Sequence, residues 1–299
     1  MKRIAGGLAA AMLLMASAGA QAAAPRACDR ACLKGMLDGY VSALVTHDPS
    51  KIPAATDVKF TENGYPLFLG DGFWRTAGPG TYRLYAIDTA QGQAALHATL
   101  SEGGEPIPFL VRLKVLGGKI TEIETIVARN ALAGGLFAPE KLPPPDLYNQ
   151  PLPKGEHPTR AELVRTGDAY FTAVQTDGTP GYKPAPFAAD ANRFENGVQT
   201  TNVSIRGGKP VSISAQLDQG MFKGVNITDR RYPVVDTETG VVLGIVMFRR
   251  AEQRLPANSI SGPARFHGMV SEMFKISGGK IRQVRAVMLP RPFGSATGW

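Results

Sequence analysis

Apolar and polar residues alternate along the first half of the chain in a pattern that predicts one amphipathic helix followed by a sheet. Apolar side chains recur at helical spacing between Asp29, which can cap a helix, and His47-Asp48-Pro49, which ends it. Period-two alternation then predicts a short strand at 58–63 and longer strands at 82–88, 93–100, 107–116 and 119–128. The last two strands are joined by Gly117-Gly118, which suits a tight hairpin.

The second half of the chain repeats the landmarks of the first half in the same order. The repeated features are a helix tyrosine, a Glu-Asn-Gly motif, an aspartate before a turn and a Gly-Gly-Lys-Ile hairpin. They begin at Tyr40, Glu62, Asp88 and Gly117 in the first half, and at Tyr170, Glu195, Asp236 and Gly278 in the second. The offsets grow steadily, from 130 to 133, 148 and 161 residues. Such growth is typical of a duplicated domain whose second copy has gained insertions, which we expect mainly at 197–226 and around 254–263.

A proline-rich stretch at 130–158 separates the two halves and predicts an extended linker. After it, Thr159 and Glu162 have the spacing of a capping box, which opens the second helix. We therefore expect a first domain at 24–129, a second domain at 159–292 and a C-terminal tail at 293–299. We name the two domains the first unit and the second unit.

Residues 1–23 have the character of a secretory signal peptide. Lys2 and Arg3 precede an apolar run that ends in Ala20-Gln21-Ala22, so we expect a mature chain that starts near Ala23 or Ala24. The run is too short and too rich in Ala and Gly to span a membrane, and no later segment is suited to do so. The sequence thus predicts a periplasmic or secreted protein.

Composition and charge exclude several classes of protein. A hydrophobic content of 43% and a charged content of 19% are globular values. Removing Lys2 and Arg3 lowers the formal net charge from +8 to +6, and the other basic residues are spread along the chain. A nucleic-acid-binding surface would cluster them with aromatic residues, so we expect no nucleic-acid partner. Mild attraction for anionic ligands is the stronger implication.

The two cysteines, Cys28 and Cys32, allow two interpretations. Export permits a disulfide, but i,i+4 spacing in a regular helix separates the Cβ atoms by about 5–6 Å, too far for a relaxed bridge. A bridge therefore requires an irregular first turn, whereas a regular turn leaves two free thiols. No histidine stands at metal-ligand spacing, and no glycine-rich nucleotide motif or serine-hydrolase motif is present, so we expect no metal and no cofactor.

Two carboxylates on the last strand of the first unit are the leading candidates for chemistry. Strict alternation places Glu122 and Glu124 on one face with Ile120 and Ile126, where they either line a pocket or stand on a solvated face. A carboxylate on an apolar face has a raised pKa, as acid–base catalysis requires. The second unit carries Gln283 and Arg285 at the same positions, so we expect the two units to differ in the ligands that they hold.

The Glu-Asn-Gly motif also allows two interpretations. Glu62-Asn63 and Glu195-Asn196 end the first strand of each unit, where the Glu can accept backbone N–H groups and pin a turn. In the functional interpretation the Glu is a base and the Asn is a donor to an oxyanion. We expect Asp88 and Asp236 to make turns, and we expect His97 to be a hydrogen-bonded residue of the sheet.

A helical hairpin followed by a curved antiparallel sheet resembles the NTF2-like (SnoaL-like) superfamily, here in two tandem copies. The Cys-Asp-Arg-x-Cys-Leu start and the Glu-Asn-Gly stretches are also similar to an uncharacterised secreted family of fungi and bacteria. The resemblance implies an α+β fold of two cones, each a helical layer on a curved antiparallel sheet. It further implies an apolar interior for a small ligand, where polar groups do the chemistry in enzymatic members while other members only bind.

We therefore expect an exported, cofactor-independent enzyme that acts on a small, partly hydrophobic molecule as a lyase, isomerase or hydrolase. The alternatives are a non-catalytic binding or scaffold protein and a domain pair without any small-molecule site; association into a homodimer stays open. The catalytic candidates, all in the first unit, are Glu62, Glu122 and Glu124. The binding candidates are Asn63, Trp74 over one mouth of the domain, Arg83, Tyr85, Arg112, Arg193, Glu195, Asn196 and Arg285.

Overall fold

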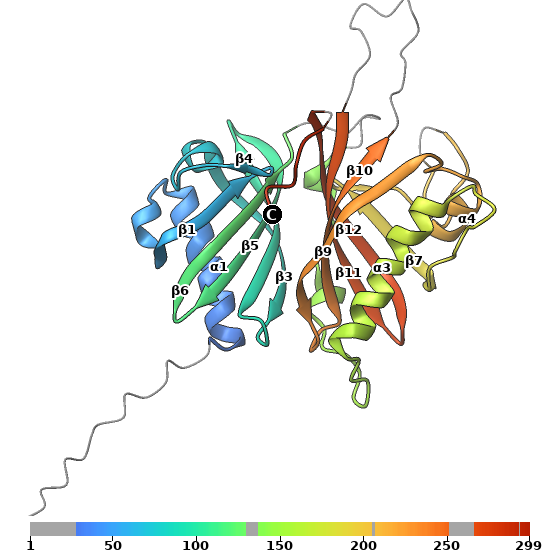
Figure 1. Cartoon of the computed structure of the whole chain (residues 1–299), viewed down its shortest axis with the longest axis horizontal. Helices are drawn as coiled ribbons and strands as arrows, with labels where there is room; N and C mark the ends of the chain where they lie inside the picture. Colours follow the sequence, from blue (N-terminus) through green and yellow to red (C-terminus); the bar gives the residue numbers. More distant parts are fainter. Residues whose placement is uncertain (1–27, 130–136, 205–206, 251–265, 293) are drawn as a thin grey trace, which may run out of the picture.

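The computed structural model describes residues 28–129, 137–204, 207–250, 266–292 and 294–299. These residues form two six-stranded sheets, each covered on its outer side by one long helix (Figure 1). The inner sides of the two sheets share an apolar layer, so the two units form an intramolecular pair. The signal peptide and the insertion expected at 254–263 lie outside the described residues. None of the helices in the described ranges is long and apolar enough to cross a membrane.

In the first unit, helix α1 (Arg30–Val45) begins where the Asp29 side chain accepts a hydrogen bond from the backbone N of Cys32. The strands are β1 (Ala54–Glu62), β2 (Tyr65–Pro66), β3 (Ala77–Asp88), β4 (Gln93–Glu102), β5 (Glu105–Leu116) and β6 (Lys119–Val127), in the sheet order β2-β1-β6-β5-β4-β3. Two short 3-10 turns, η1 (Pro49–Lys51) and η2 (Gly72–Arg75), complete the helical layer. This layer is one helix with two turns, and not the helical hairpin expected from the resemblance.

The second unit repeats this arrangement. Helix α3 (Arg160–Thr176) opens with the expected capping box of Thr159 and Glu162. The strands are β7 (Phe187–Glu195), β8 (Val198–Gln199), β9 (Val225–Asp236), β10 (Val241–Arg250), β11 (Phe266–Ser277) and β12 (Lys280–Pro292), in the order β8-β7-β12-β11-β10-β9. The insertion after β8 carries α4 (Ile213–Asp218), and the linker carries η3 (Pro139–Lys141) and α2 (Asp146–Asn149). The matching strand orders confirm two tandem α+β units.

One strand pairing in each sheet differs from the expected antiparallel pattern. Strand β1 runs parallel to β6, and β7 runs parallel to β12. Three hairpins connect β3 to β6 and force these strands to alternate in direction. Strand β1 is joined to β3 through η2 and not by a hairpin, so its direction is free of that constraint. The sheets are therefore mixed, with a single parallel pair at equivalent places.

A bulge on β6 corrects the expected arrangement of side chains on that strand. Ile120 pairs with Val115 and Glu122 pairs with Lys114, so Thr121 has no partner on β5. The extra residue turns Ile120 toward the helix-side core, whereas Glu124 and Ile126 face the other sheet. The prediction that Ile120 shares a face with the two glutamates is wrong because strict alternation holds only in an unbulged strand.

The layer between the sheets is closed at one end by two reciprocal aspartates. Asp88 accepts hydrogen bonds from Gln91 N in its own turn and from Val235 N in the other unit, at 3.1 and 2.9 Å. Asp236 accepts from Thr239 N in its own turn and from Ile87 N across the interface, at 3.2 and 3.0 Å. Each aspartate also pairs with the first arginine of the opposite unit's long helix. Arg160 of α3 pairs with Asp88, and Arg30 of α1 pairs with Asp236. The turn-making prediction is confirmed, and both aspartates also hold the units together.

The segments that follow the two sheets cross to the opposite unit. Ala138, after β6, donates its backbone N–H to Asn196 O at 2.9 Å. A Cβ built on Gly197 would lie 1.9 Å from Ala138 O. After β12, the tail returns to the first unit, where Trp299 Nε1 donates to Thr61 Oγ1 at 2.8 Å. Each Glu-Asn-Gly motif is therefore covered by chain from the other half.

The cysteines form a disulfide between Cys28 and Cys32. Cys28 precedes the N-cap residue Asp29, so it lies outside the regular helix. The irregular first turn that a bridge requires is present, which resolves the choice between bridge and free thiols.

Candidate functional site

The asparagines of the two Glu-Asn-Gly motifs clamp the ends of neighbouring strands. Asn63 donates its side-chain amide to Val127 O at 3.1 Å and accepts from Val127 N at 2.8 Å. Asn196 makes the same pair with Met288, at 2.8 and 2.9 Å. Both residues have positive φ, which Asn tolerates better than most residues. Both amides are thus fully used by the backbone, and the structural interpretation of Asn63 and Asn196 is confirmed.

The glutamates of the two motifs have different surroundings. Glu62 accepts from Phe73 N at 2.7 Å and from Arg129 Nη1 at 3.0 Å, so it holds η2 at the end of the first core. Glu195 instead lies 3.3 Å from Nε of Arg193, which is 1% exposed. Glu62 therefore pins a turn, while Glu195 belongs to a buried charged cluster in the second unit.

Glu122 and Glu124 both form ion pairs, and neither lines the pockets described beside α1, η2 and α3. Glu124 is fully buried between the sheets, where it accepts from Arg112 Nε at 2.9 Å and from Arg231 Nη2 of the second unit at 2.5 Å. Glu122 accepts from Arg112 Nη1 at 2.7 Å and from Lys114 at 3.1 Å. Burial acts to raise the pKa of Glu122, but these two cations bring it below its ordinary value. A solvated location is wrong for Glu124, which packs against the second sheet, whereas 26% of the Glu122 side chain is exposed.

The other first-unit candidates are dispersed. Trp74 is buried in the core with its ring edge-on to Tyr40, 5.1 Å between centroids, and it also lines a surface pocket with Gly70 and Asp71. Tyr85 donates its hydroxyl to Asp38 at 2.5 Å, and Arg83 lies 3.9 Å from the same carboxylate. This trio lies against helix α1, outside the sheet-to-sheet layer that contains Glu124. The structure does not bring these side chains together with the three catalytic candidates.

Arg285 belongs to the layer between the units. Its guanidinium donates to Tyr82 of the first unit and to the carbonyl oxygens of Pro143 and Pro144 in the linker. His97 lies beside Tyr82, with ring centroids 5.4 Å apart, and neither of its ring nitrogens has a hydrogen-bond partner among the described residues. Burial, and then the charge of Arg285, lower the pKa of His97 to about 3. The prediction of a hydrogen-bonded histidine is wrong, and His97 is a neutral core residue.

The interior of the second unit contains a buried charged cluster. Arg193 projects from β7 and donates to Thr200 Oγ1 at 3.0 Å and to the Tyr170 hydroxyl at 3.4 Å. Glu195 lies on the same strand, two residues on. Glu272 enters from β11, between Val270 and Phe274 of the same core. One arginine, two carboxylates and a phenol thus meet inside a core that is otherwise apolar.

Glu272 is the residue of this cluster that sequence reasoning missed. It is 2% exposed, and its Oε2 has no hydrogen-bond partner within the described part of the chain. Burial raises the pKa of Glu272 to about 8; the charge of Glu195 adds to the rise, while Arg193 and a hydrogen bond from Tyr170 oppose it. A carboxyl group with this pKa can hold a proton near neutral pH and release it, which is the property of a general acid or base.

The first unit keeps Tyr40 and Glu62 at the places of Tyr170 and Glu195, but its other two equivalent positions are apolar. The strand registers match Arg193 with Phe60 and Glu272 with Val111. Both of these first-unit residues lie in a core filled by the unit's own aromatic side chains, including Phe73 and Phe109. The charged interior is therefore a property of the second unit.

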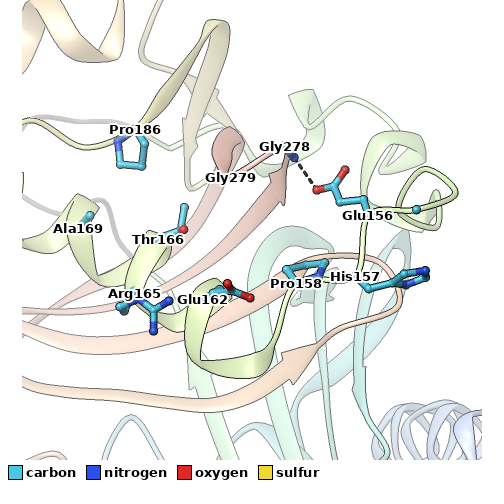
Figure 2. A pocket seen from close by; sticks show the side chains of 11 residues that line it. Glu156, His157, Pro158, Glu162, Arg165, Thr166, Ala169, Pro186, Gly278 and Gly279 are labelled. Atoms are coloured by element: carbon cyan, nitrogen blue, oxygen red, sulfur yellow. Dashed lines mark hydrogen bonds between the residues drawn. The ribbon is translucent and has the colours of Figure 1, made fainter.

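A surface pocket of about 610 Å³ lies beside α3 (Figure 2). The linker residues Glu156 and His157 form one wall, the first turns of α3 form another, and Gly278-Gly279 closes the end (Figure 2). Glu156 already accepts from Ser277 Oγ and Gly278 N, and Glu162 is used in the capping box. The pocket contains none of the predicted site residues.

The fold and the buried cluster define a tandem pair of α+β units, of which the second has charged side chains in its apolar core. The chain belongs to the family described as "Domain of unknown function (DUF8021)", whose model matches residues 26–127 and 156–288. No curated protein matches the chain.

Two solved structures are similar to parts of this chain. One is an NTF2-like protein of unknown function from Cytophaga hutchinsonii, at 10% identity and a TM-score of 0.27, covering 32% of this chain and 88% of its own. The other is a protein of unknown function with a cystatin-like fold from Methylobium petroleophilum, at 14% identity and a TM-score of 0.31, covering 45% of this chain and 100% of its own.

Proposed function

We propose that the interior of the second unit carries out acid–base chemistry on a small, partly hydrophobic molecule, without a cofactor, as a lyase, isomerase or hydrolase. The observation that carries the proposal is Glu272, a buried carboxyl group with an unpartnered oxygen and a pKa of about 8. Perturbed ionisable groups of this kind gather at functional sites. This moves the expected chemistry from the first unit to the second.

Each member of the cluster has a role in this proposal. Glu272 gives or takes the proton. Arg193, whose charge is held in place by Glu195, stabilises negative charge that develops on a carbonyl or hydroxyl oxygen. Tyr170, which accepts a hydrogen bond from Arg193, sits between the arginine and Glu272 and can relay a proton. The surrounding side chains, among them Phe171 and Phe274, exclude water from the reaction.

The first unit serves as a scaffold in this proposal. Its core is filled by its own side chains, and its carboxylate pair is neutralised by Arg112 and Arg231. The reciprocal contacts of Asp88 and Asp236 attach it to β9 of the second unit. The alternative, a non-catalytic binding or scaffold protein built from both units, predicts that Glu272→Gln changes ligand binding but no turnover.

We further propose that the protein works outside the cytoplasm. The signal-like N-terminus supports export, and a disulfide between Cys28 and Cys32 is expected to persist in an oxidising compartment. Mass spectrometry of protein from its native host would contradict export if it found residues 1–22 intact.

A screen of small ketones, esters and epoxides in deuterated buffer tests the catalytic proposal. NMR detects both product formation and exchange of protons beside a carbonyl group. For any compound that is turned over, Glu272→Gln should lower the rate by about 10²–10⁴-fold. Glu62→Gln is the matched control, because Glu62 occupies the place of Glu195 in the first unit. Full activity of a folded Glu272→Gln variant would overturn the proposal.

A further inference from the structure

The insertion of the second unit places two of its own side chains on the charged cluster. Gln216 of α4 is 3% exposed, and its Oε1 accepts from Arg193 Nη2 at 2.7 Å. Its Nε2 donates to Thr200 O at 2.5 Å. The primary amide of Gln216 thus satisfies one donor and one acceptor inside the unit at the same time.

An aromatic ring from the same insertion covers the guanidinium. The Phe222 ring centroid lies 5.0 Å from Cζ of Arg193, within the range of a cation–π contact. Phe222 is half-buried, whereas Arg193 is 1% exposed, so the ring packs on a guanidinium that has almost no contact with solvent. One guanidinium thus contacts both an amide and an aromatic ring, the two groups that an aromatic carboxamide combines.

The charges of the cluster decide between a neutral and an anionic ligand. Arg193 is the only cation in this group of described side chains, and Glu195 already pairs with it at 3.3 Å. Glu272, whose pKa is raised to about 8, supplies no positive charge that could balance a ligand carboxylate. A buried anion without a matching cation is costly, whereas a neutral amide reproduces the hydrogen bonds of Gln216 without adding charge.

We propose that the second unit binds a neutral carboxamide attached to an apolar ring, and that this ligand takes the places of the Gln216 amide and the Phe222 ring on Arg193. The inference rests on the proposed function, since it concerns the same cluster. In the bound state the ligand oxygen accepts from Arg193 Nη2 and the ligand N–H donates to Thr200 O. Gln216 and Phe222 act as an internal cover that the ligand displaces.

Calorimetric titration of the full chain with three probes tests the ligand chemistry. Benzamide has the required acceptor and donor, N,N-dimethylbenzamide lacks the donor, and benzoate carries a charge. We expect benzamide to bind most tightly and benzoate most weakly. Binding of benzoate equal to or tighter than that of benzamide would overturn the inference.

Removal of the internal competitor tests the displacement. Because a hydrogen bond to a charged group is released on displacement, Gln216→Ala should bind benzamide about tenfold more tightly than wild type. Gln219→Ala is the matched control, since Gln219 follows the same helix and is exposed. Unchanged affinity in Gln216→Ala, or an equal gain in Gln219→Ala, would count against displacement.

A measurement on the wild-type chain covers the case in which Gln216→Ala does not fold. Saturating benzamide should shift the side-chain amide NMR signals of Gln216 and leave those of Gln219 in place; unshifted Gln216 signals would refute displacement.

The catalytic proposal and the ligand proposal can be contradicted separately. If benzamide binds as described while Glu272→Gln keeps full turnover, only the catalytic role of Glu272 is contradicted. If benzamide binds neither wild type nor Gln216→Ala, only the assignment of an aromatic carboxamide as the ligand is contradicted.

Discussion

Replacement of Glu124 by Gln should destabilise the protein strongly, because this buried carboxylate is shared by two arginines, one from each unit. Arg112 Nε lies 2.9 Å from one oxygen and Arg231 Nη2 lies 2.5 Å from the other, and the side chain of Glu124 is 0% exposed. The substitution removes the negative charge that both guanidinium groups share. Breaking a buried ion pair costs about 3–5 kcal/mol.

Glu122→Gln is the matched control for this prediction. Glu122 lies on the same strand and shares Arg112, but 26% of its side chain is exposed. Ion pairs near solvent contribute about 0–1 kcal/mol, and Arg112 keeps Glu124 as a partner.

Thermal and urea unfolding at fixed pH measure the difference between the two variants. Since about 1 kcal/mol shifts the Tm of a protein of this size by about 2–4 °C, Glu124→Gln should lower the Tm by at least about 6 °C and Glu122→Gln by no more than about 4 °C. Equal effects of the two substitutions would refute the buried, shared pair. A folded Glu124→Gln variant without turnover would return the active site to the first unit.

Three further changes have defined outcomes. Gly197→Ala should lower the unfolding free energy by on the order of 2 kcal/mol, because its Cβ would lie 1.9 Å from Ala138 O at a φ of +92°. Gly278→Ala, at a φ of +60° with open space around the new Cβ, should cost less, and urea unfolding that ranks the two in reverse would contradict the linker contact. His97 is neutral in the fold but titrates at its ordinary 6.5 when unfolded, so stability should fall as the pH drops from 6.5 toward about 3. His97→Phe should reduce this loss, and an unchanged pH dependence of the Tm would mean that the ring is solvated. Glu272 has its pKa raised from 4.5 to about 8, so its contribution to stability is present below 4.5 and is lost as the pH rises toward about 8, by at most about 1.4 kcal/mol per pH unit. The stability of wild type relative to Glu272→Gln should therefore fall over that range, and a constant difference would argue against the raised pKa.

Local signals in the sequence predicted the order of elements well. The capping box at Thr159 and the Gly-Gly hairpins depend on residues close in the chain, so their physical causes are visible in the sequence. The repeat of landmarks predicted two similar units because equivalent contacts require equivalent residues.

The contacts between the units could not be predicted in this way. Asp88 was recognisable as a turn residue, but its bond to Val235 N joins positions far apart in the chain. The bulge at Thr121 places Ile120 on the face opposite Glu124 and Ile126, and the strand sequence carries no mark of it. The second sheet that covers Glu124 could not be inferred from local patterns. Glu124 was therefore expected to line a pocket or a solvated face of the first unit.

Glu272 was missed for a related reason. It lies in the run Val270-Ser271-Glu272-Met273-Phe274, where both faces of the strand are apolar apart from one polar residue each. Ser271 faces the other unit and Glu272 faces the helix, a distinction that depends on which side each layer covers. The sequence nevertheless contained a signal. Glu272 is a lone carboxylate in an apolar strand, and the first unit has Val111 at the matching position. Such a difference between two copies of one fold indicates that their interiors differ in role.

The titration of Glu272 tests the central claim most directly. Carbon-13 labelling of the glutamate side-chain carboxyl groups allows each to be followed by NMR across the pH range, and Glu272→Gln identifies its signal. Burial of this carboxyl group in the core of the second unit predicts a midpoint near 8, far above the ordinary 4.5. A midpoint near 4.5 would mean that Glu272 is ionised and screened at neutral pH, and the second unit would then lack the proton donor on which the proposed chemistry depends.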